Sequence, residues 1–279
     1  MGRNIVKALS ESSPDSRIIP VYSPRQGGID LTLPGAKEAL EKKIHIAEPK
    51  EAVLIHAAAV VEWDSADGLI DNTLMAINVA SWAKDTGIGF SIFVSTVSVY
   101  DDIPYADIAT PCNPTTFYGI GKLTAEHILR NMISWERRAI VRLSGIWGWQ
   151  KSPTLFWNRL LLAAVREVPP ESKPIVKRFK SRRNYISARE AANCILYLGE
   201  NRIPGLFLGA GRDVIDTRFF VEAVQHLPGS KLSVIWQDDG GSDEVIYKQS
   251  PEFVPLLKPF SEELMTIWEN RPEWVVNIQ

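Results

Sequence analysis

Apolar residues in the first half of the chain form short continuous runs, which alternate with segments where they recur every three or four positions. The continuous runs are typical of strands covered on both faces of a parallel sheet, and they occupy residues 17–22, 52–61, 90–100 and 138–148. The periodic segments predict helices at residues 69–87, with Gly87 as the last residue, and at 116–135. Such alternation indicates βαβ units, so we expect an α/β fold built on a doubly wound parallel sheet.

The pattern is less regular after residue 149. It predicts a basic, proline-containing loop at 168–183, a short strand at 205–211, and helices at 151–167, 188–200, 216–227 and 261–274. We therefore expect one larger domain over residues 1–148, to which residues 181–210 return. A smaller C-terminal lobe would be formed by residues 149–180 and 211–279.

The composition excludes several classes of function. The chain has 279 residues and a formal net charge of −2, so nothing favours nucleic acid or a membrane surface as its partner. No apolar run approaches the roughly 18 residues that a transmembrane helix needs, and the first residues lack the apolar core of a secretion signal. Cys112 and Cys194 lack metal-ligand spacing, so we expect free thiols, no metal site and a reducing, cytoplasmic location.

Tyr118 and Lys122 stand four positions apart in a segment predicted to be helical, so both side chains fall on one helix face. A phenol titrates at a pH of about 10, and a neighbouring ammonium ion favours its anion, which makes the phenol a usable acid–base group. Ser95 and Thr96 come at the carboxyl end of a predicted strand, where open parallel sheets bind their ligands. A hydroxyl there could hold a carbonyl oxygen while Tyr118 moves the proton. YxxxK alone is a weak signal, and a solvated helix face with an accidental Tyr and Lys stays open.

Several segments of the chain follow one another in the order and spacing of a known family: LIHAAA, NVASWAKDTGI, FVSTVSVY, YGIGKLTAEHIL, VRLSGIWG and RRNYISAREAANCILYL. In these segments, over residues 2–208, the chain resembles the extended short-chain dehydrogenase/reductase family, specifically the NAD-dependent epimerase/dehydratase group. The resemblance implies a Rossmann-type domain that binds a dinucleotide and a small C-terminal lobe that binds the substrate. It also implies catalytic roles for Thr96, Tyr118 and Lys122.

The resemblance implies an NAD(P)-dependent reductase or epimerase that acts on a carbonyl or alcohol centre. Thr96 is favoured over Ser95, the fallback, because it stands four residues before Tyr100, as in the family's usual SSxxVY. Val97 stands where dehydratases carry an acidic residue, which argues against dehydration. A dinucleotide-binding regulator and an inactive truncated homologue remain alternatives. A homodimer through the helix that carries the catalytic pair is expected from the resemblance alone.

The first residues match the family only in part. Gly2 corresponds to the last glycine of the family's TGxxGxxG motif and opens a predicted helix. The strand and the two glycines expected before it have no counterpart in the sequence, although those glycines make the tight turn and admit the pyrophosphate. Three explanations are open: the given sequence starts late at an internal Met, which is favoured; a natural truncation abolishes activity; or a rearranged cofactor site works.

The resemblance implies cofactor contacts at Gly2, Ser23, Arg25, Asp30, Ala57, Ala58 and Lys122. In NAD-dependent members the second strand of the domain ends at a carboxylate that holds the ribose. Here the corresponding predicted strand ends at Ser23, with Arg25 two residues further on. No carboxylate there repels a 2′-phosphate and a guanidinium can pair with one, so NADP is favoured over NAD. A solvated Arg25 is the alternative. His56, inside a buried run, is interpreted as a core residue.

We expect the small-molecule substrate to contact Ser98, Trp147, Arg178 and Arg182. The basic loop over residues 173–183 could bind the diphosphate of a nucleotide sugar, although a charge run is more often a solvated face. RLSGIWGW lacks the Asn, Tyr and Pro of the RxxNxYGP motif that sugar-modifying members usually show. The substrate therefore stays open between a sugar or nucleotide sugar and another carbonyl compound.

Overall fold

The structure is a computed structural model of the chain. It describes residues 2–12, 17–21, 23–100, 103–150, 155–177, 180–237, 241 and 243–276, with only the backbone at residues 12, 25 and 276. The chain folds into two compact units. Unit 1 comprises Met1–Asp102, Ile108–Leu143 and Ala191–Gly209, and unit 2 comprises Ile103–Asp107, Ser144–Glu190 and Ala210–Gln279. Within the described ranges, no helix is both long and apolar enough to cross a membrane.

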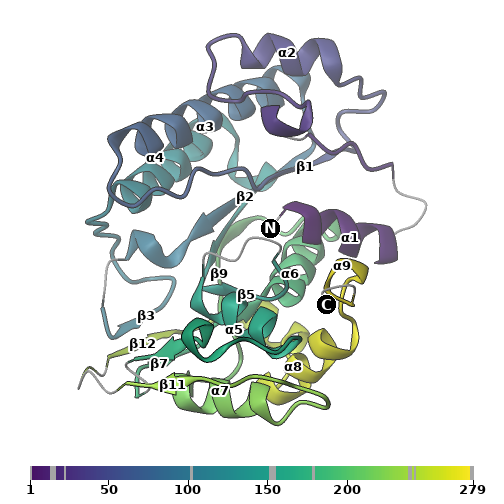
Figure 1. Cartoon of the computed structure of the whole chain (residues 1–279). Coiled ribbons are helices and arrows are strands. Elements are labelled where there is room, and N and C mark those ends of the chain that lie inside the picture. Colours follow the sequence, from purple (N-terminus) through teal and green to yellow (C-terminus); the bar gives the residue numbers. More distant parts are fainter. Residues whose placement is uncertain are drawn as a thin grey trace. The chain divides into compact units, whose positions relative to one another are not determined.

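Unit 1 is built on a four-stranded parallel sheet in the order β1-β2-β4-β9 (Figure 1). Its strands are β1 (Val53–His56), β2 (Phe90–Thr96), β4 (Arg138–Leu143) and β9 (Gly205–Gly209). Every residue of β2 is buried, as a strand with neighbours on both sides and helices on both faces requires. The parallel sheet confirms the α/β, Rossmann-type fold that the sequence predicts.

Helices cover both faces of this sheet. α3 (Ala66–Thr86) and α4 (Phe117–Met132) pack against each other and share a hydrophobic cluster with Phe93 of β2. α6 (Ala188–Glu200) lies on the opposite face, because its Gly199 approaches the side chain of Ile92 and successive strand residues point to opposite faces. α2 (Ala36–Lys43) packs on α3, and α1 (Gly2–Ser12) opens the chain.

Local sequence sets the ends of α3 and α4. The Ser65 hydroxyl accepts the N–H of Gly68 at 3.4 Å, and the Thr116 hydroxyl accepts the N–H of Gly119 at 3.1 Å, so each hydroxyl caps a helix start. Gly87 adopts the left-handed conformation with φ of 78°. Its predicted position at the end of α3 is therefore confirmed.

The structure corrects several of the predicted strands. Residues 17–21 form no strand: Ile19 and Val21 are 40% and 43% exposed, and Pro20 has no N–H for a sheet ladder. The run at 138–148 forms two strands, because Ser144 donates its hydroxyl hydrogen to the carbonyl of Asn184 and the chain turns into unit 2. The run at 52–61 is a strand only as far as the end of β1.

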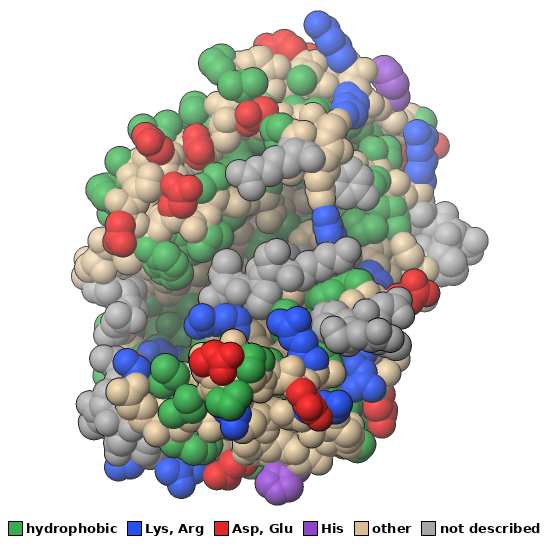
Figure 2. All heavy atoms as spheres, viewed as in Figure 1, with side chains coloured by type: hydrophobic (Ala, Val, Ile, Leu, Met, Phe, Trp, Pro, Cys, Tyr) green, Lys and Arg blue, Asp and Glu red, His purple; other side chains and the backbone are tan. Residues whose placement is uncertain are grey.

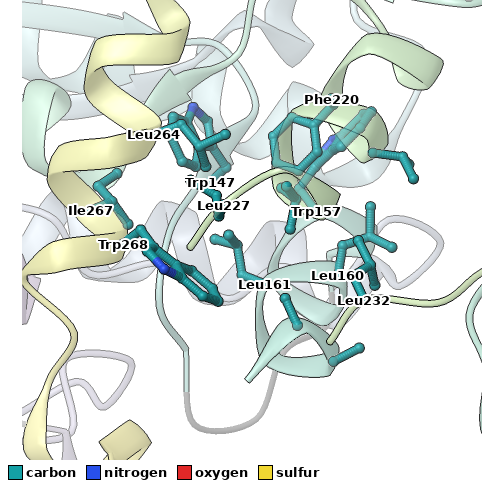
Figure 3. Close-up of a cluster of buried hydrophobic side chains, with 14 of the residues drawn as sticks. Trp147, Trp157, Leu160, Leu161, Phe220, Leu227, Leu232, Leu264, Ile267 and Trp268 are labelled. Atoms are coloured by element: carbon teal, nitrogen blue, oxygen red, sulfur yellow. The ribbon is translucent and has the colours of Figure 1, made fainter. Parts of the chain in front are cut away.

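Unit 2 consists of short strands and helices around an aromatic core. One sheet has the order β10 (Ile215–Asp216), β7 (Arg182–Arg183), β12 (Glu244–Tyr247) and β3 (Tyr105–Ala106). Two further pairs join β11 (Ile235–Trp236) to β6 (Ile175–Val176), and β5 (Ile146–Trp147) to β8 (Ile186–Ser187). The helices are α5 (Phe156–Ala164), α7 (Thr217–Gln225), α8 (Phe260–Glu269) and α9 (Glu273–Val276). Figure 3 shows the core, in which Trp147, Trp157, Phe220 and Trp268 meet.

Candidate active site

Thr96 and Tyr118 meet where β2 ends and α4 begins. Thr96 is the last residue of β2, and its hydroxyl accepts the N–H of Ser98 at 3.2 Å in the turn η2 (Val97–Val99). Tyr118 is the second residue of α4, and the Thr96 side chain is near enough to its hydroxyl to lower the Tyr118 pKa, against the larger effect of burial. Strand, turn and helix thus bring together the two hydroxyls that the sequence singles out.

Close packing of α4 against η2 makes this meeting possible. Gly119 follows Tyr118 in α4, and a Cβ added there would lie 2.4 Å from the carbonyl oxygen of Ser98 and 2.9 Å from Cβ of Pro114. Any side chain would therefore push the start of α4 away from η2. Position 119 requires glycine for the approach of two backbones.

Lys122 lies one helical turn beyond Tyr118 and is 3% exposed. Its Nζ donates to the carbonyl of Val94 at 2.7 Å and lies 4.1 Å from the centre of the Phe93 ring. Burial lowers the pKa of Lys122 to about 7, although the nearby carboxylate of Glu126 acts in the opposite direction. The amine is thus poised to gain or lose a proton near neutral pH.

The pKa of Tyr118 is raised, because burial disfavours the phenolate more than the hydrogen bond from Thr96 favours it. The sequence predicts the opposite direction, from the proximity of Lys122. In the structure Lys122 directs its Nζ to Val94 and Phe93 instead. Tyr118 is consequently a neutral phenol at neutral pH in this arrangement.

A buried network of hydrogen bonds and an ion pair lies one helical turn beyond Lys122 in α4. Glu126, one turn beyond Lys122, accepts hydrogen bonds from Arg142 Nε and Nη2 at 2.9 and 2.7 Å and from the Ser95 hydroxyl at 2.6 Å. Arg142 Nη1 donates to the Tyr100 hydroxyl at 2.8 Å. Ser95 therefore faces this network while Thr96 faces Tyr118. The sequence-based reasoning missed the pair, although a Glu four positions after Lys122 and an Arg inside an apolar strand were visible signals.

Trp63 is a second residue that the sequence-based reasoning missed. Its ring lies edge-on to Tyr118, with the ring centres 5.1 Å apart and an angle of 62° between the planes. Its carbonyl accepts the N–H of Phe117 at 3.1 Å, which ties the segment after β1 to the start of α4. A tryptophan outside a periodic apolar pattern gives no sequence signal for such a contact.

His56 ends β1 beside this group. It is 7% exposed and stacks on Phe93, with ring centres 5.4 Å apart. Burial, together with the charge of Lys122, lowers the pKa of His56 to about 3. The ring is neutral at physiological pH and packs in the interior, in line with its interpretation as a core residue.

A family model and several solved structures match this chain. The model of the NAD dependent epimerase/dehydratase family covers residues 1–206. The chain belongs to this family. Its sequence has no significant match among curated proteins.

Several solved structures share the fold of this chain. A dTDP-4-dehydrorhamnose reductase from Bacillus anthracis in complex with NADP has a TM-score of 0.75 and 17% identity, covering 96% of this chain and 94% of that one. RMD from Pseudomonas aeruginosa complexed with NADPH has a TM-score of 0.73 and 16% identity, covering 96% of each chain. A UDP-glucuronic acid 4-epimerase from Bacillus cereus in complex with NAD has a TM-score of 0.66 and 18% identity, covering 85% and 78%.

Two of the expected cofactor contacts follow β1. Ala57 and Ala58 come directly after its last residue, and β1 runs parallel to β2, so they leave the sheet at the same edge as Thr96. Ala58 is exposed. Small side chains at this edge, with Lys122 one helical turn beyond Tyr118, fit the nicotinamide and ribose of the dinucleotide on which the family depends.

The other expected contacts lie apart from this group. Gly2 opens α1, with no atom within 4 Å of the position a Cβ would take, and exposed Ser23 precedes η1 (Pro24–Gln26). Asp30 accepts the hydroxyl and N–H of Thr32 at 2.7 and 3.0 Å, and these bonds lower its pKa. The side chain of Arg25 lies outside the described residues. Among the described residues, no hydrogen bond or ion pair joins Gly2, Ser23 or Asp30 to the Tyr118 group.

The expected substrate residues divide between the two units. Ser98, in unit 1, lies beside Thr96, with 3.0 Å between the two hydroxyl oxygens. Trp147, in unit 2, is 1% exposed and packs against Phe220 and Phe260, with ring centres 5.8 and 5.4 Å apart (Figure 3). The structure places this tryptophan in the interior of unit 2 and not on a surface that a ligand could reach.

The two arginines expected at the substrate also belong to unit 2. Arg178 lies outside the described residues. Arg182, in β7, is exposed, and its Nη1 lies 2.6 Å from a carboxylate oxygen of Glu244. It also borders a cavity of about 390 Å³ in unit 2, together with Phe219 and Phe260.

Proposed function

We propose that this chain is an NAD(P)-dependent oxidoreductase or epimerase acting on a carbonyl or alcohol centre of a sugar or nucleotide sugar. The observation that carries the proposal is that Thr96 ends β2 next to Tyr118 at the start of α4, with Lys122 one helical turn further along the same helix. These groups lie at the carboxyl end of a parallel sheet, where α/β enzymes act on their ligands. Membership of the NAD dependent epimerase/dehydratase family supports the same class of reaction.

Tyr118 would act as the proton donor and acceptor. Because burial raises its pKa, the phenol is neutral at physiological pH and can give its proton to a carbonyl oxygen as that oxygen becomes an alcohol. Thr96 would hold the same oxygen through its hydroxyl. Lys122, with a pKa of about 7, would return a proton to Tyr118 or withdraw one from it. In the reverse direction the same residues take the proton of an alcohol.

The cofactor would supply or accept the hydride. Ala57, Ala58 and Lys122 would hold its nicotinamide and ribose, while Gly2, Ser23, Arg25 and Asp30 would contact the remainder. We favour NADP over NAD because the segment from Ser23 to Arg25 offers no carboxylate against a 2′-phosphate. Fold relatives have been solved with NADP, with NADPH and with NAD, so they support a nicotinamide dinucleotide of either kind.

We also propose a division of labour between the two units. Unit 1 would be the dinucleotide-binding domain, and unit 2 would be the substrate-binding lobe. Arg178 and Arg182 would bind the diphosphate of a nucleotide sugar through their positive charge. The dTDP- and UDP-sugar enzymes among the solved structures of similar fold support this substrate class.

Replacement of Tyr118 by Phe tests the proposal. With NADPH and a panel of dTDP- and UDP-linked keto sugars, Tyr118→Phe should lower kcat by about 10²- to 10⁴-fold while NADPH still binds. Loss of the proton donor alone explains that pattern, because the ring and its contact with Trp63 remain.

Tyr105→Phe, at an exposed position in unit 2, is the matched control and should leave turnover unchanged. Turnover that survives Tyr118→Phe would contradict the assigned proton carrier. Tight NADPH binding by the wild type with no turnover of any substrate in the panel would favour a dinucleotide-binding regulator instead.

A further inference from the structure

An exposed tryptophan stands beside the proposed proton donor. Trp63 is 46% exposed, although its ring contacts Tyr118 and its backbone carbonyl is bonded to Phe117. A large aromatic side chain that served only the core would be more fully covered. Part of the Trp63 side chain therefore remains available to a ligand beside the Tyr118 ring.

The segment that carries Trp63 is fixed at two points. The buried side-chain amide of Asn72 donates to the carbonyl of Val60 at 2.8 Å, and its oxygen accepts the N–H of Val60 at 3.1 Å. Three residues later, the carbonyl of Trp63 accepts the N–H of Phe117 at 3.1 Å. Because the backbone on both sides of Trp63 is already held, binding a ligand costs only the conformational entropy of the Trp63 side chain.

Further apolar side chains are exposed next to this tryptophan. Val61, in the same segment, is 58% exposed, and Phe117, at the start of α4, is 41% exposed. Figure 2 shows hydrophobic and acidic side chains together at the surface over α3 and α4, the helices that follow and adjoin this segment. Exposed apolar surface with polar neighbours is typical of a binding surface.

We propose that Trp63 is the platform for the ring of the substrate that carries the reacting carbon, and that this ring is a neutral hexose. A hexose presents a face of C–H bonds, which suits the flat apolar face of an indole, and its hydroxyls suit the polar edge. Glu62 and Asp64 are exposed on either side of Trp63, so a ring without a carboxylate is favoured. This inference deepens the proposed function and rests on it for the direction of the reacting oxygen toward Tyr118.

Binding measurements test the platform without any need for turnover. Isothermal calorimetry would compare UDP-glucose with UDP, dTDP-glucose with dTDP, and GDP-mannose with GDP, in the presence of NADP⁺. For at least one pair the wild type should bind the sugar nucleotide about 10-fold more tightly than the nucleotide alone. Trp63→Ala should reduce that ratio to nearly one while leaving the affinity for the nucleotide unchanged, and Trp63→Phe should keep most of it.

Trp135→Ala is the matched control, because Trp135 is 54% exposed in the same unit and contacts Arg138. It should leave the ratio at its wild-type value. If Trp63→Ala does not fold, Trp63→Phe takes its place, with tryptophan fluorescence as the measurement. The fluorescence change on adding the sugar nucleotide should be lost in Trp63→Phe and kept in Trp135→Phe. No preference for any sugar nucleotide in the wild type, or an unchanged ratio in Trp63→Ala, would overturn the platform. Turnover that survives Tyr118→Phe would overturn the proposed function alone.

Discussion

Lys122 combines its proposed role in the reaction with a cost to stability. Its amine is buried against Val94 and Phe93, and burial lowers its pKa to about 7 from the ordinary value of 10.5. The unfolded chain therefore binds more protons than the folded one between these two values, so the free energy of unfolding rises with pH across that window. Below pH 7 the folded protein carries the full cost of a buried ammonium ion.

Lys122→Met should therefore separate stability from activity. Methionine fills similar space beside the Phe93 ring without a charge, so the free energy of unfolding at pH 6 should increase by about 1–3 kcal/mol. Turnover should fall by at least about 100-fold, because the amine proposed to hold the cofactor ribose and to exchange the proton of Tyr118 is lost. Urea unfolding at pH 6 and pH 9 provides the measurement, and the gain should shrink at the higher pH. A loss of stability at pH 6 would contradict the cost assigned to this amine.

At the same scale, the sequence predicts positions better than electrostatics. The YxxxK spacing and the strand-end hydroxyls single out Thr96, Tyr118 and Lys122, and the structure places Thr96 next to Tyr118 while the Lys122 amine points to Val94 and Phe93. Their catalytic roles stay a prediction. The direction of the Tyr118 pKa shift was wrong, since it depends on burial and on where the Lys122 amine points. Trp63 escaped notice because its contact with Tyr118 joins segments far apart in the chain.

The start of α4 and the turn after β2 form the structural device that holds the two hydroxyls together. Gly119→Ala should displace α4 from η2, because the new Cβ would lie 2.4 Å from the carbonyl oxygen of Ser98. A shift of about 1 Å in reacting groups lowers rates by about 100-fold, so kcat should fall by one to two orders of magnitude. Steady-state kinetics on the folded variant, checked by circular dichroism, gives the measurement.

Gly35→Ala is the control for this substitution, since Gly35 has open space around it and a negative φ of −90°. It should leave kcat at the wild-type value. Normal kcat in Gly119→Ala would mean that α4 can shift without parting Thr96 from Tyr118, which contradicts the role given to this close approach.

Among the elements, the sequence predicts best where pattern and local capping agree. α3 ends at Gly87 as expected, since only glycine readily takes the left-handed conformation found there. The predicted strand at residues 17–22 failed although its apolar run looked typical, because a strand also needs a neighbour that pairs with it. Within the apolar run at 138–148 the chain passes from unit 1 to unit 2, because β4 pairs in unit 1 and β5 pairs in unit 2. Hydrophobic periodicity alone does not reveal such a passage.

Over the whole molecule, each unit contains a buried group that responds to pH. In unit 1, the pKa of His56 is lowered to about 3, chiefly by burial, so stability is lost as pH falls from 6.5 toward 3. In unit 2, burial and the charge of Glu263 raise the pKa of Glu190 to about 7, although Glu190 accepts the N–H of Lys258 at 2.9 Å. Its stabilising contribution is complete below pH 4.5 and is lost as pH rises through 7. His56 and Glu190 therefore act on the stability of their units in opposite directions as the pH falls, and we expect the two units to respond accordingly.

Hydrogen exchange read separately on each unit should reveal this opposition. From pH 7 to pH 5, after correction for intrinsic rates, the most protected amides of β2 should lose about 2 kcal/mol of protection and those of α8 should gain about as much. His56→Gln should remove the change in unit 1 alone, and Glu190→Gln the change in unit 2 alone, whatever each does to absolute stability. Equal changes in both units of the wild type would mean that they unfold as one body, so that the two titrations offset each other. A change in unit 1 that persists in His56→Gln would show that another group than this buried imidazole binds the proton.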